Sequence, residues 1–233
     1  RLIAQAIAGP LGQQVIVDNR AAPILAAEFV SKAPPDGYTL YVSGNSIWIT
    51  PLLQKTPYDA VRDFSPVTVI VREVSVVVVH PSLPVKSIKE LIALAKARPG
   101  ELNYGSASIG SIAHLAGELF KSMGGVNIEA VQYKGGAAAI TALVSGEVQQ
   151  AILDARLVAP HVKPGKLRAL AVTSATPSLA VPGLPTVSAA GVPGYEAIGM
   201  TSILAPGRTP AAIVSRLHQE IVRALNLPDV KEK

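Results

Sequence analysis

The sequence contains no cysteine, few aromatic residues and few charged ones. The absence of Cys among its 233 residues excludes disulfides, thiol catalysis and cysteine-bound zinc. Charged residues make up 16% and hydrophobic residues 49%, so the chain can bury enough apolar surface to fold, and extended disorder is excluded. The longest apolar run, residues 67–79, contains Arg72 and Glu73 and is shorter than the roughly 20 residues that cross a bilayer. No transmembrane helix is predicted.

The charge pattern argues against a nucleic-acid-binding protein. The net charge is +5, but the basic residues are scattered singly rather than gathered in a stripe that could neutralise several phosphates. The aromatic residues, 4% of the chain, are dispersed as well. No basic segment is followed by an apolar one, so no signal peptide is predicted within these residues.

Short β-branched runs alternate with segments of helical periodicity, which is typical of an α/β fold with parallel strands. The expected strands are residues 14–18, 38–43, 67–71, 74–79, 126–133, 148–153 and 167–172. Helices are expected to begin after Ser87, Ser111, Gly135 and Thr209. Proline-rich and glycine-rich stretches at 81–84 and 182–193 predict two crossings between lobes. We therefore expect one lobe of residues 1–82 and 196–233 and a second of residues 83–195.

A loop rich in glycine and serine, residues 105–111, follows an expected strand and leads into a helix. Small residues such as Ala107 let backbone N–H groups approach a ligand, and the start of a helix favours an anion. We therefore predict ligand contacts from Ser106 to Ser108, Gly110 and Ser111. The loop has the glycine spacing of a P-loop, but Ser111 stands where its lysine is required, which argues against a triphosphate site. An ordinary helix cap is the alternative.

Three other segments have polar groups at strand ends. Tyr133, Lys134 and Gly135 precede a helix, and Lys134 is either a charge beside the helix start or a solvated loop residue. Two such helix starts in one lobe are expected to converge at the carboxyl ends of the strands. Asp154 ends another strand as a helix cap or as a partner for a ligand amine. Residues 43–46 (Ser43, Gly44, Asn45 and Ser46) would supply donors from the other lobe.

A serine hydrolase is the competing interpretation. His114 lies one helical turn after Ser111, so either Ser108 or Ser111 could act as nucleophile with His114 as base. The sequence around Ser108 lacks the first glycine of a nucleophile elbow, because Ser106 stands there. No His or carboxylate cluster has metal-ligand spacing, and we predict neither a metal nor a cofactor.

Motifs along almost the whole chain resemble the Bug family of extracytoplasmic solute receptors, also called TctC-like, of tripartite tricarboxylate transporters. The matching runs are Pro35-Asp-Gly-Tyr-Thr-Leu40, Pro57-Tyr58, Asp63-Phe64, His80-Pro-Ser-Leu-Pro84, Leu102-Asn-Tyr-Gly-Ser106, Ala113-His-Leu-Ala-Gly-Glu-Leu-Phe120, Tyr133-Lys-Gly135, Gly165-Lys-Leu-Arg-Ala-Leu-Ala-Val172, Leu184-Pro-Thr186 and Leu204-Ala-Pro206.

The resemblance implies a type II periplasmic-binding-protein fold, in which two α/β lobes close over a small organic carboxylate without catalysis. It carries the ligand-binding role to residues 43–46, 106–111, 133–135 and Asp154, and His114 lies beside them. It further implies a periplasmic location and, as partners, the membrane components of the transporter; we expect a monomer. The family's first strand and glycine-rich loop, and its C-terminal segment, are expected to be missing from this chain.

Overall fold

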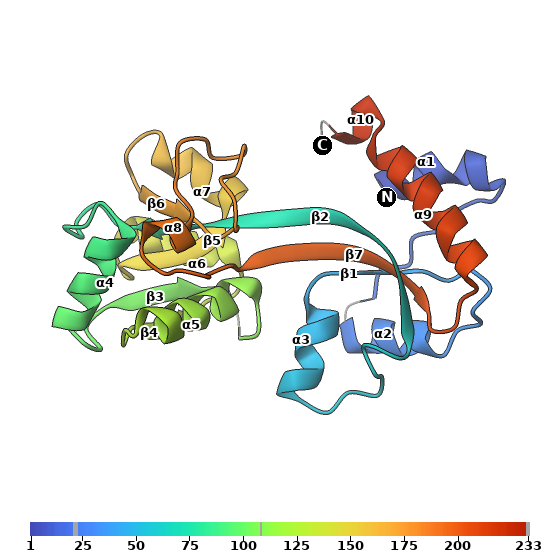
Figure 1. Cartoon of the computed structure of the whole chain (residues 1–233), viewed down its shortest axis with the longest axis horizontal. Coiled ribbons are helices and arrows are strands. Elements are labelled where there is room, and N and C mark those ends of the chain that lie inside the picture. The colour runs from blue at the N-terminus through green and yellow to red at the C-terminus, as the bar shows by residue number, and fades with distance from the viewer. Residues whose placement is uncertain (21–22, 108, 232–233) are drawn as a thin grey trace. The chain divides into compact units, whose positions relative to one another are not determined.

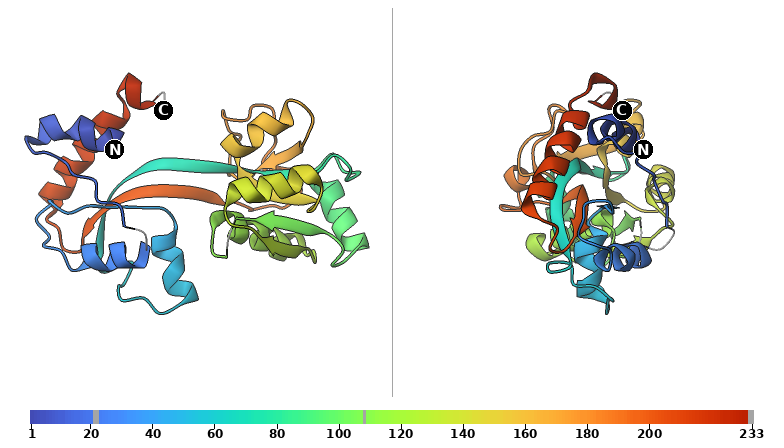
Figure 2. Two further views of the ribbon diagram at one scale, coloured as in Figure 1. Left: turned by 180° about the vertical axis from the view of Figure 1, so that it is seen from behind. Right: turned by 90° about the vertical axis from the view of Figure 1, so that its right-hand side faces the viewer.

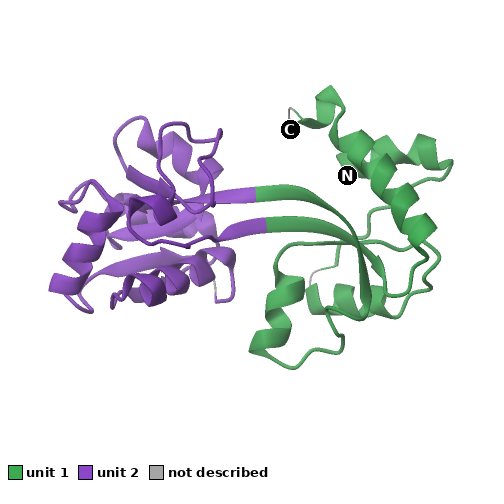
Figure 3. Cartoon of the chain, in the orientation of Figure 1, with its two compact units in different colours: residues 1–72, 200–233 green, residues 73–199 purple. Residues whose placement is uncertain are grey.

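The computed structural model describes residues 1–20, 23–107 and 109–231, and the chain forms two compact units. One unit contains residues 1–72 and 200–233, and the other contains residues 73–199 (Figure 3). The chain passes from one unit to the other inside two strands, β2 (Phe64–Val79) and β7 (Ile198–Pro206).

The unit of residues 1–72 and 200–233 is built from helices around a small group of strands (Figure 1). Strand β1 (Tyr41–Ser43) pairs antiparallel with β7. The helices lying wholly in this unit are α1 (Leu2–Leu11), α2 (Pro23–Ser31), α3 (Ser46–Leu53), α9 (Ala211–Leu225) and α10 (Pro228–Lys231). Helix α1 packs against α9 (Figure 2), and Ile7, Leu217 and Ile221 fill the space between them.

The unit of residues 73–199 is a mixed sheet with helices on both faces. Its strands are the second half of β2 together with β3 (Asn103–Ser106), β4 (Glu129–Gln132), β5 (Gln150–Asp154) and β6 (Arg168–Val172). Its helices are α4 (Ile88–Ala97), α5 (Ile112–Gly124), α6 (Gly136–Ser145), α7 (Ala155–Val162) and α8 (Val187–Ala190). Strand β3 pairs in parallel with β4 and β5, whereas β2 pairs antiparallel with β5 and β6.

Successive side chains of β2 point to opposite faces of the sheet, which explains why residues 74–79 are almost uninterrupted valine. Val77 and Val79 belong to a core with α4 and α5, while Val76 and Val78 belong to a core with α6 and α7 on the opposite face. A strand covered on both faces needs apolar side chains at every position. The predicted α/β class is confirmed, although the sheet is mixed rather than wholly parallel.

Several local predictions need correction. Residues 14–18 form no strand, because they have no pairing partner and Ile16 is 82% exposed. The runs 67–71 and 74–79 belong to one 16-residue strand that continues through Arg72 and Glu73. Thr209 does not cap α9: Pro210 stands at the cap position, and the Thr209 hydroxyl donates to the carbonyl of Pro206.

The helix starts at Ser87 and Ser111 are confirmed, because each hydroxyl accepts a backbone N–H three residues later, at 3.2 Å. Within the part of the chain that the structure describes, no helix is both long and apolar enough to cross a membrane.

Candidate functional site

Three helix starts lie along one edge of the sheet in the unit of residues 73–199. Strands β4, β3 and β5 are parallel neighbours, and the helices that follow them are α6, α5 and α7. Parallel strands end at the same edge, so the first turns of these three helices share it. The predicted segments 106–111 and 133–135 and residue Asp154 are therefore brought to a common edge.

Ser106, the last residue of β3, has a hydroxyl at this edge with no hydrogen-bond partner among the described residues. Its side chain is fully buried, and its Oγ makes no hydrogen bond with any described residue. Buried polar groups are nearly always paired, and leaving one unpaired costs roughly 1–3 kcal/mol. The hydroxyl therefore needs a polar partner that the described residues do not supply. Ser108, which the sequence also predicts as a ligand contact, lies outside the described residues.

The rest of the β3–α5 loop is held by its own hydrogen bonds. Ser111 caps α5 by accepting the backbone N–H of His114 at 3.2 Å. The Gly110 N–H, in the left-handed region at φ 76°, donates to Nδ1 of His114 at 3.3 Å. In the structure the Gly110 amide therefore already has an acceptor, Nδ1 of His114, and its contact with a ligand stays a prediction.

The loop after β4 is tied to the loop after β3. The N–H of Tyr133 donates to the carbonyl of Ser106 at 2.8 Å, and the N–H of Gly135 donates to the carbonyl of Ala107, also at 2.8 Å. Gly135 adopts φ 97°, a conformation that side chains disfavour. Its amide, like that of Gly110, is engaged internally. No described residue accepts a bond from the following amides, residues 136–138, which begin α6.

Tyr133 and Lys134 behave differently at this position. The Tyr133 hydroxyl donates to Glu147 Oε1 at 2.8 Å, and burial together with that hydrogen bond raises the pKa of Tyr133 to about 12. Its proton is thus retained at physiological pH and directed to Glu147. The Lys134 side chain is exposed and adds a positive charge near the start of α6.

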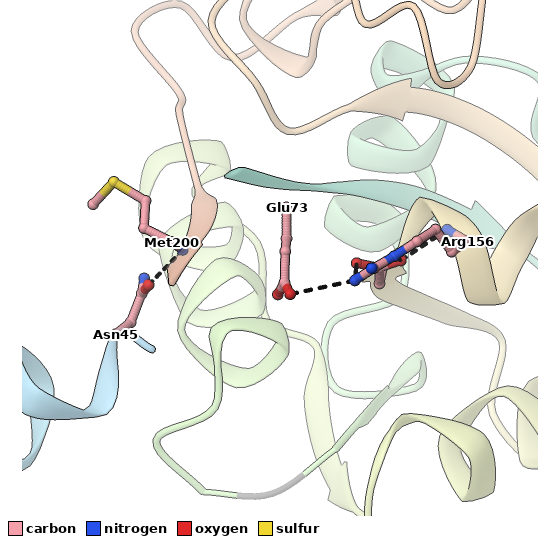
Figure 4. A network of polar contacts seen from close by, with 5 residues as sticks. Asn45, Glu73, Arg156 and Met200 are labelled. Carbon is pink, nitrogen blue, oxygen red and sulfur yellow. Dashed lines mark hydrogen bonds and ion pairs between the residues drawn. The ribbon is translucent and has the colours of Figure 1, made fainter. Parts of the chain in front are cut away.

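Asp154 is a helix cap that also holds Arg156, whose guanidinium contacts Glu73 as well (Figure 4). Its Oδ1 accepts the Arg156 backbone N–H at 2.8 Å and Nε at 2.9 Å, and its Oδ2 accepts Nη2 at 3.0 Å. Nη2 also contacts Glu73 Oε1 at 3.3 Å. Partial burial raises the pKa of Asp154, and the hydrogen bonds from Arg156 lower it by more. Of the two interpretations of Asp154, the structure contains the cap.

The sequence interpretation missed Arg156 and Glu73. Arg156 lies two residues after Asp154, so the pair is a local signal that could have been noticed. Glu73 is 83 residues away from Arg156 and comes from β2, and no sequence pattern marks that contact.

The predicted segment in the other unit, residues 43–46, joins the end of β1 to α3. Ser43 is buried and its hydroxyl donates to the carbonyl of Gly44 at 3.1 Å. Asn45 Oδ1 accepts the backbone N–H of Met200 at 2.6 Å (Figure 4), and Ser46 begins α3. These contacts fix the turn between β1 and α3.

The described residues have the geometry of a helix cap rather than of a nucleophile and base. Ser111 Oγ accepts from the backbone of His114, and Nδ1 of His114 accepts from Gly110. Among the described residues there is no group of three or more His, Asp or Glu side chains that could hold a metal ion.

The whole chain, residues 1–233, matches the family described as the tripartite tricarboxylate transporter family receptor, TctC. It is 36% identical to BugT of Bordetella pertussis over 191 residues, which are 80% of this chain and 59% of that protein. The structure of an R. palustris protein with adipate matches with a TM-score of 0.80 and 40% identity, over 99% of this chain and 78% of that one. MatC from Rhodopseudomonas palustris with bound malate matches with a TM-score of 0.77 and 28% identity, over 99% and 80%.

The fold and the strand-end helix starts are those of a solute-binding receptor. The chain belongs to the TctC family, which includes the Bug proteins, and the family resemblance of the sequence is confirmed. The family consists of extracytoplasmic receptors rather than enzymes, and nothing among these relatives supports a hydrolase. The chain spans about three fifths of BugT's length.

Proposed function

We propose that this chain binds a small organic carboxylate, without turnover, as the receptor of a tripartite tricarboxylate transporter in the periplasm. The observation that carries the proposal is the strand edge where three helix starts meet beside the buried hydroxyl of Ser106, which no described residue pairs. Amides at the start of α6 and the hydroxyl donor suit a carboxylate, which accepts several charge-assisted hydrogen bonds. Relatives with adipate and malate bound support dicarboxylates as the first ligands to try.

Residues 43–46, 106–111, 133–135, His114 and Asp154 remain our proposed ligand-binding set. A few charge-assisted hydrogen bonds, each about 1.5–3 kcal/mol, are enough for binding near micromolar, about −8 kcal/mol, after the costs of association. We further propose that the receptor acts as a monomer and delivers the ligand to the membrane components of its transporter.

The test is calorimetric titration and thermal shift with malate, adipate and a panel of other carboxylates. We expect Ser111→Ala to weaken binding more than Lys134→Ala, because Ser111 lies at the helix start and Lys134 is exposed. Ser87→Ala is the matched control, since Ser87 caps α4 with the same 3.2 Å bond as Ser111 makes in α5. It should lower stability similarly and leave affinity unchanged.

The hydrolase alternative is tested in parallel with p-nitrophenyl esters. Turnover that disappears in His114→Ala would overturn the receptor proposal. Equal loss of affinity from Ser87→Ala and Ser111→Ala would show that only folding, and not the site, had been perturbed.

A further inference from the structure

Arg156 has one edge of its guanidinium fully occupied and the other nearly open. A guanidinium offers two edges that fit a carboxylate, each with two parallel N–H donors. Asp154 takes the first edge with two bonds, from Nε at 2.9 Å and Nη2 at 3.0 Å. Glu73 touches only Nη2 of the second edge, at 3.3 Å, and no described residue accepts from Nη1. The side chain of Arg156 is 72% exposed, so the second edge is accessible.

Arg156 follows one of the three strands whose ends form the candidate site. Arg156 is in the first turn of α7, directly after β5, the parallel neighbour of β3. The next residue, Leu157, lies against the start of α6: a Cβ on Gly136 would come within 2.8 Å of Leu157 Cδ1. Arg156 therefore belongs to the same strand edge as the buried Ser106 hydroxyl and the amides that begin α6.

We propose that Arg156 binds a carboxylate of the ligand through this second edge, and that Glu73 is an internal competitor that the ligand displaces. The inference rests on the proposed function, because it assumes a carboxylate ligand at this strand edge. Asp154 holds the guanidinium in place throughout. Glu73 contacts this edge with one bond of 3.3 Å, whereas the carboxylate of the ligand makes two.

The charges of the three side chains explain why an exchange, rather than an addition, is required. Asp154, Glu73 and Arg156 together carry a net charge of −1, so a further carboxylate approaching Arg156 meets repulsion until Glu73 moves away. The backbone of β7 lies beside Glu73 at Gly199. A Cβ built on Gly199 would lie 3.0 Å from Glu73 Oε2 and 3.1 Å from Glu73 Cβ. The glycine leaves room for the Glu73 side chain beside β7.

The experiment compares the affinities of malate and adipate for the wild-type chain and five variants, one of them a control, by calorimetric titration. Glu73→Gln removes the competing charge at constant size, and we expect it to raise affinity about three- to tenfold. Arg156→Gln should lower affinity about tenfold or more. Arg156→Lys should also lower affinity, because an ammonium group cannot hold Asp154 and the ligand as two bidentate pairs. The gain from Glu73→Gln should vanish in the double variant with Arg156→Gln, which separates displacement from a general change in charge.

Glu28→Gln is the matched control. Glu28 is 31% exposed and pairs with Lys32, much as Glu73 is 35% exposed and pairs with Arg156, but it lies on α2 in the other unit. It should leave affinity unchanged. Thermal unfolding of every variant shows whether it folds. If Arg156→Gln does not fold, the affinity of Arg156→Lys is the measurement that tests the role of Arg156.

The outcomes separate this inference from the proposed function. If the wild type binds neither dicarboxylate, both are overturned for this ligand class. If the wild type binds but Glu73→Gln has unchanged affinity, only the displacement is overturned. A loss of affinity in Glu73→Gln would also overturn it, since Glu73 would then be a direct contact of the ligand.

Discussion

Replacing Gly117 in α5 with alanine tests how the helix that carries Ser111 and His114 is seated on the sheet. Gly117 is buried, and its missing side chain leaves room for the ring of Tyr104 from β3. A Cβ at this position would lie 2.6 Å from Tyr104 Cζ and 2.9 Å from its hydroxyl oxygen, and it would also contact Cε2. Ordinary carbon contacts are about 3.5–4.0 Å, so either the ring or the helix must move.

The Tyr104 ring has little freedom to move. It is 2% exposed, and its hydroxyl donates to Glu118 Oε1 at 2.7 Å. Overpacking of this kind costs about 1–3 kcal/mol, while alanine gains up to about 1 kcal/mol over glycine in a helix interior. We therefore expect Gly117→Ala to lower the free energy of unfolding by about 1–2 kcal/mol.

The assay is urea unfolding followed by circular dichroism, with hydrogen exchange of residues 112–124 to localise the effect. Gly124→Ala on the same helix is the control: its Cβ would meet its nearest neighbours at 3.7 and 3.8 Å, so we expect unchanged or slightly raised stability. Exchange in α5 should become faster in Gly117→Ala alone. A Gly117→Ala protein as stable as Gly124→Ala would refute the packing argument.

Two further predictions concern buried polar groups in the same unit. Thr173 is fully buried, and its hydroxyl accepts from the Ser75 N–H at 3.1 Å and donates to the Ser75 carbonyl at 3.0 Å. Thr173→Val should therefore lower the free energy of unfolding, measured by calorimetry, by about 1–3 kcal/mol, clearly more than Thr173→Ser. Equal losses of stability in the two variants would contradict this. Because the pKa of Asp154 is lowered in the folded state, its charge stabilises the fold above its unfolded pKa of about 3.9, and this contribution is lost as the pH falls through the folded value. The stability difference between wild type and Asp154→Asn should accordingly shrink below about pH 4 in acid titrations, and a constant difference would be evidence against the ion pair.

Much of the local structure could be predicted because its causes are local. The caps at Ser87 and Ser111 each depend on a hydroxyl and an amide three residues apart, and Gly125 ends α5 in the left-handed conformation that glycine favours. Residues 14–18 show the limit of this approach. Their alternation is typical of a strand, but a strand also needs a partner, and pairing is decided by distant parts of the chain.

The candidate site divides in the same way. The turns at Gly110 and Gly135 are recognisable in the sequence because glycine adopts positive φ more readily than any other residue. Both glycines have positive φ in the structure. Which acceptor each amide finds is not recognisable, because Gly135 donates to a carbonyl 28 positions earlier, that of Ala107. The contact between Glu73 and Arg156 is equally hidden, as a charged pair inside an apolar run gives no indication of its partner.

These internal bonds bear on how such a site would gain its selectivity. The amides of Gly110 and Gly135 and the second edge of Arg156 each have an acceptor supplied by the protein. A ligand gains from them only the difference between its own bonds and those it replaces. A single carboxylate oxygen would gain little by replacing the 3.3 Å contact of Glu73, whereas a carboxylate that forms two parallel bonds gains more. Under the proposed exchange, the second edge of Arg156 favours a carboxylate over a neutral acceptor, because a carboxylate forms both parallel bonds.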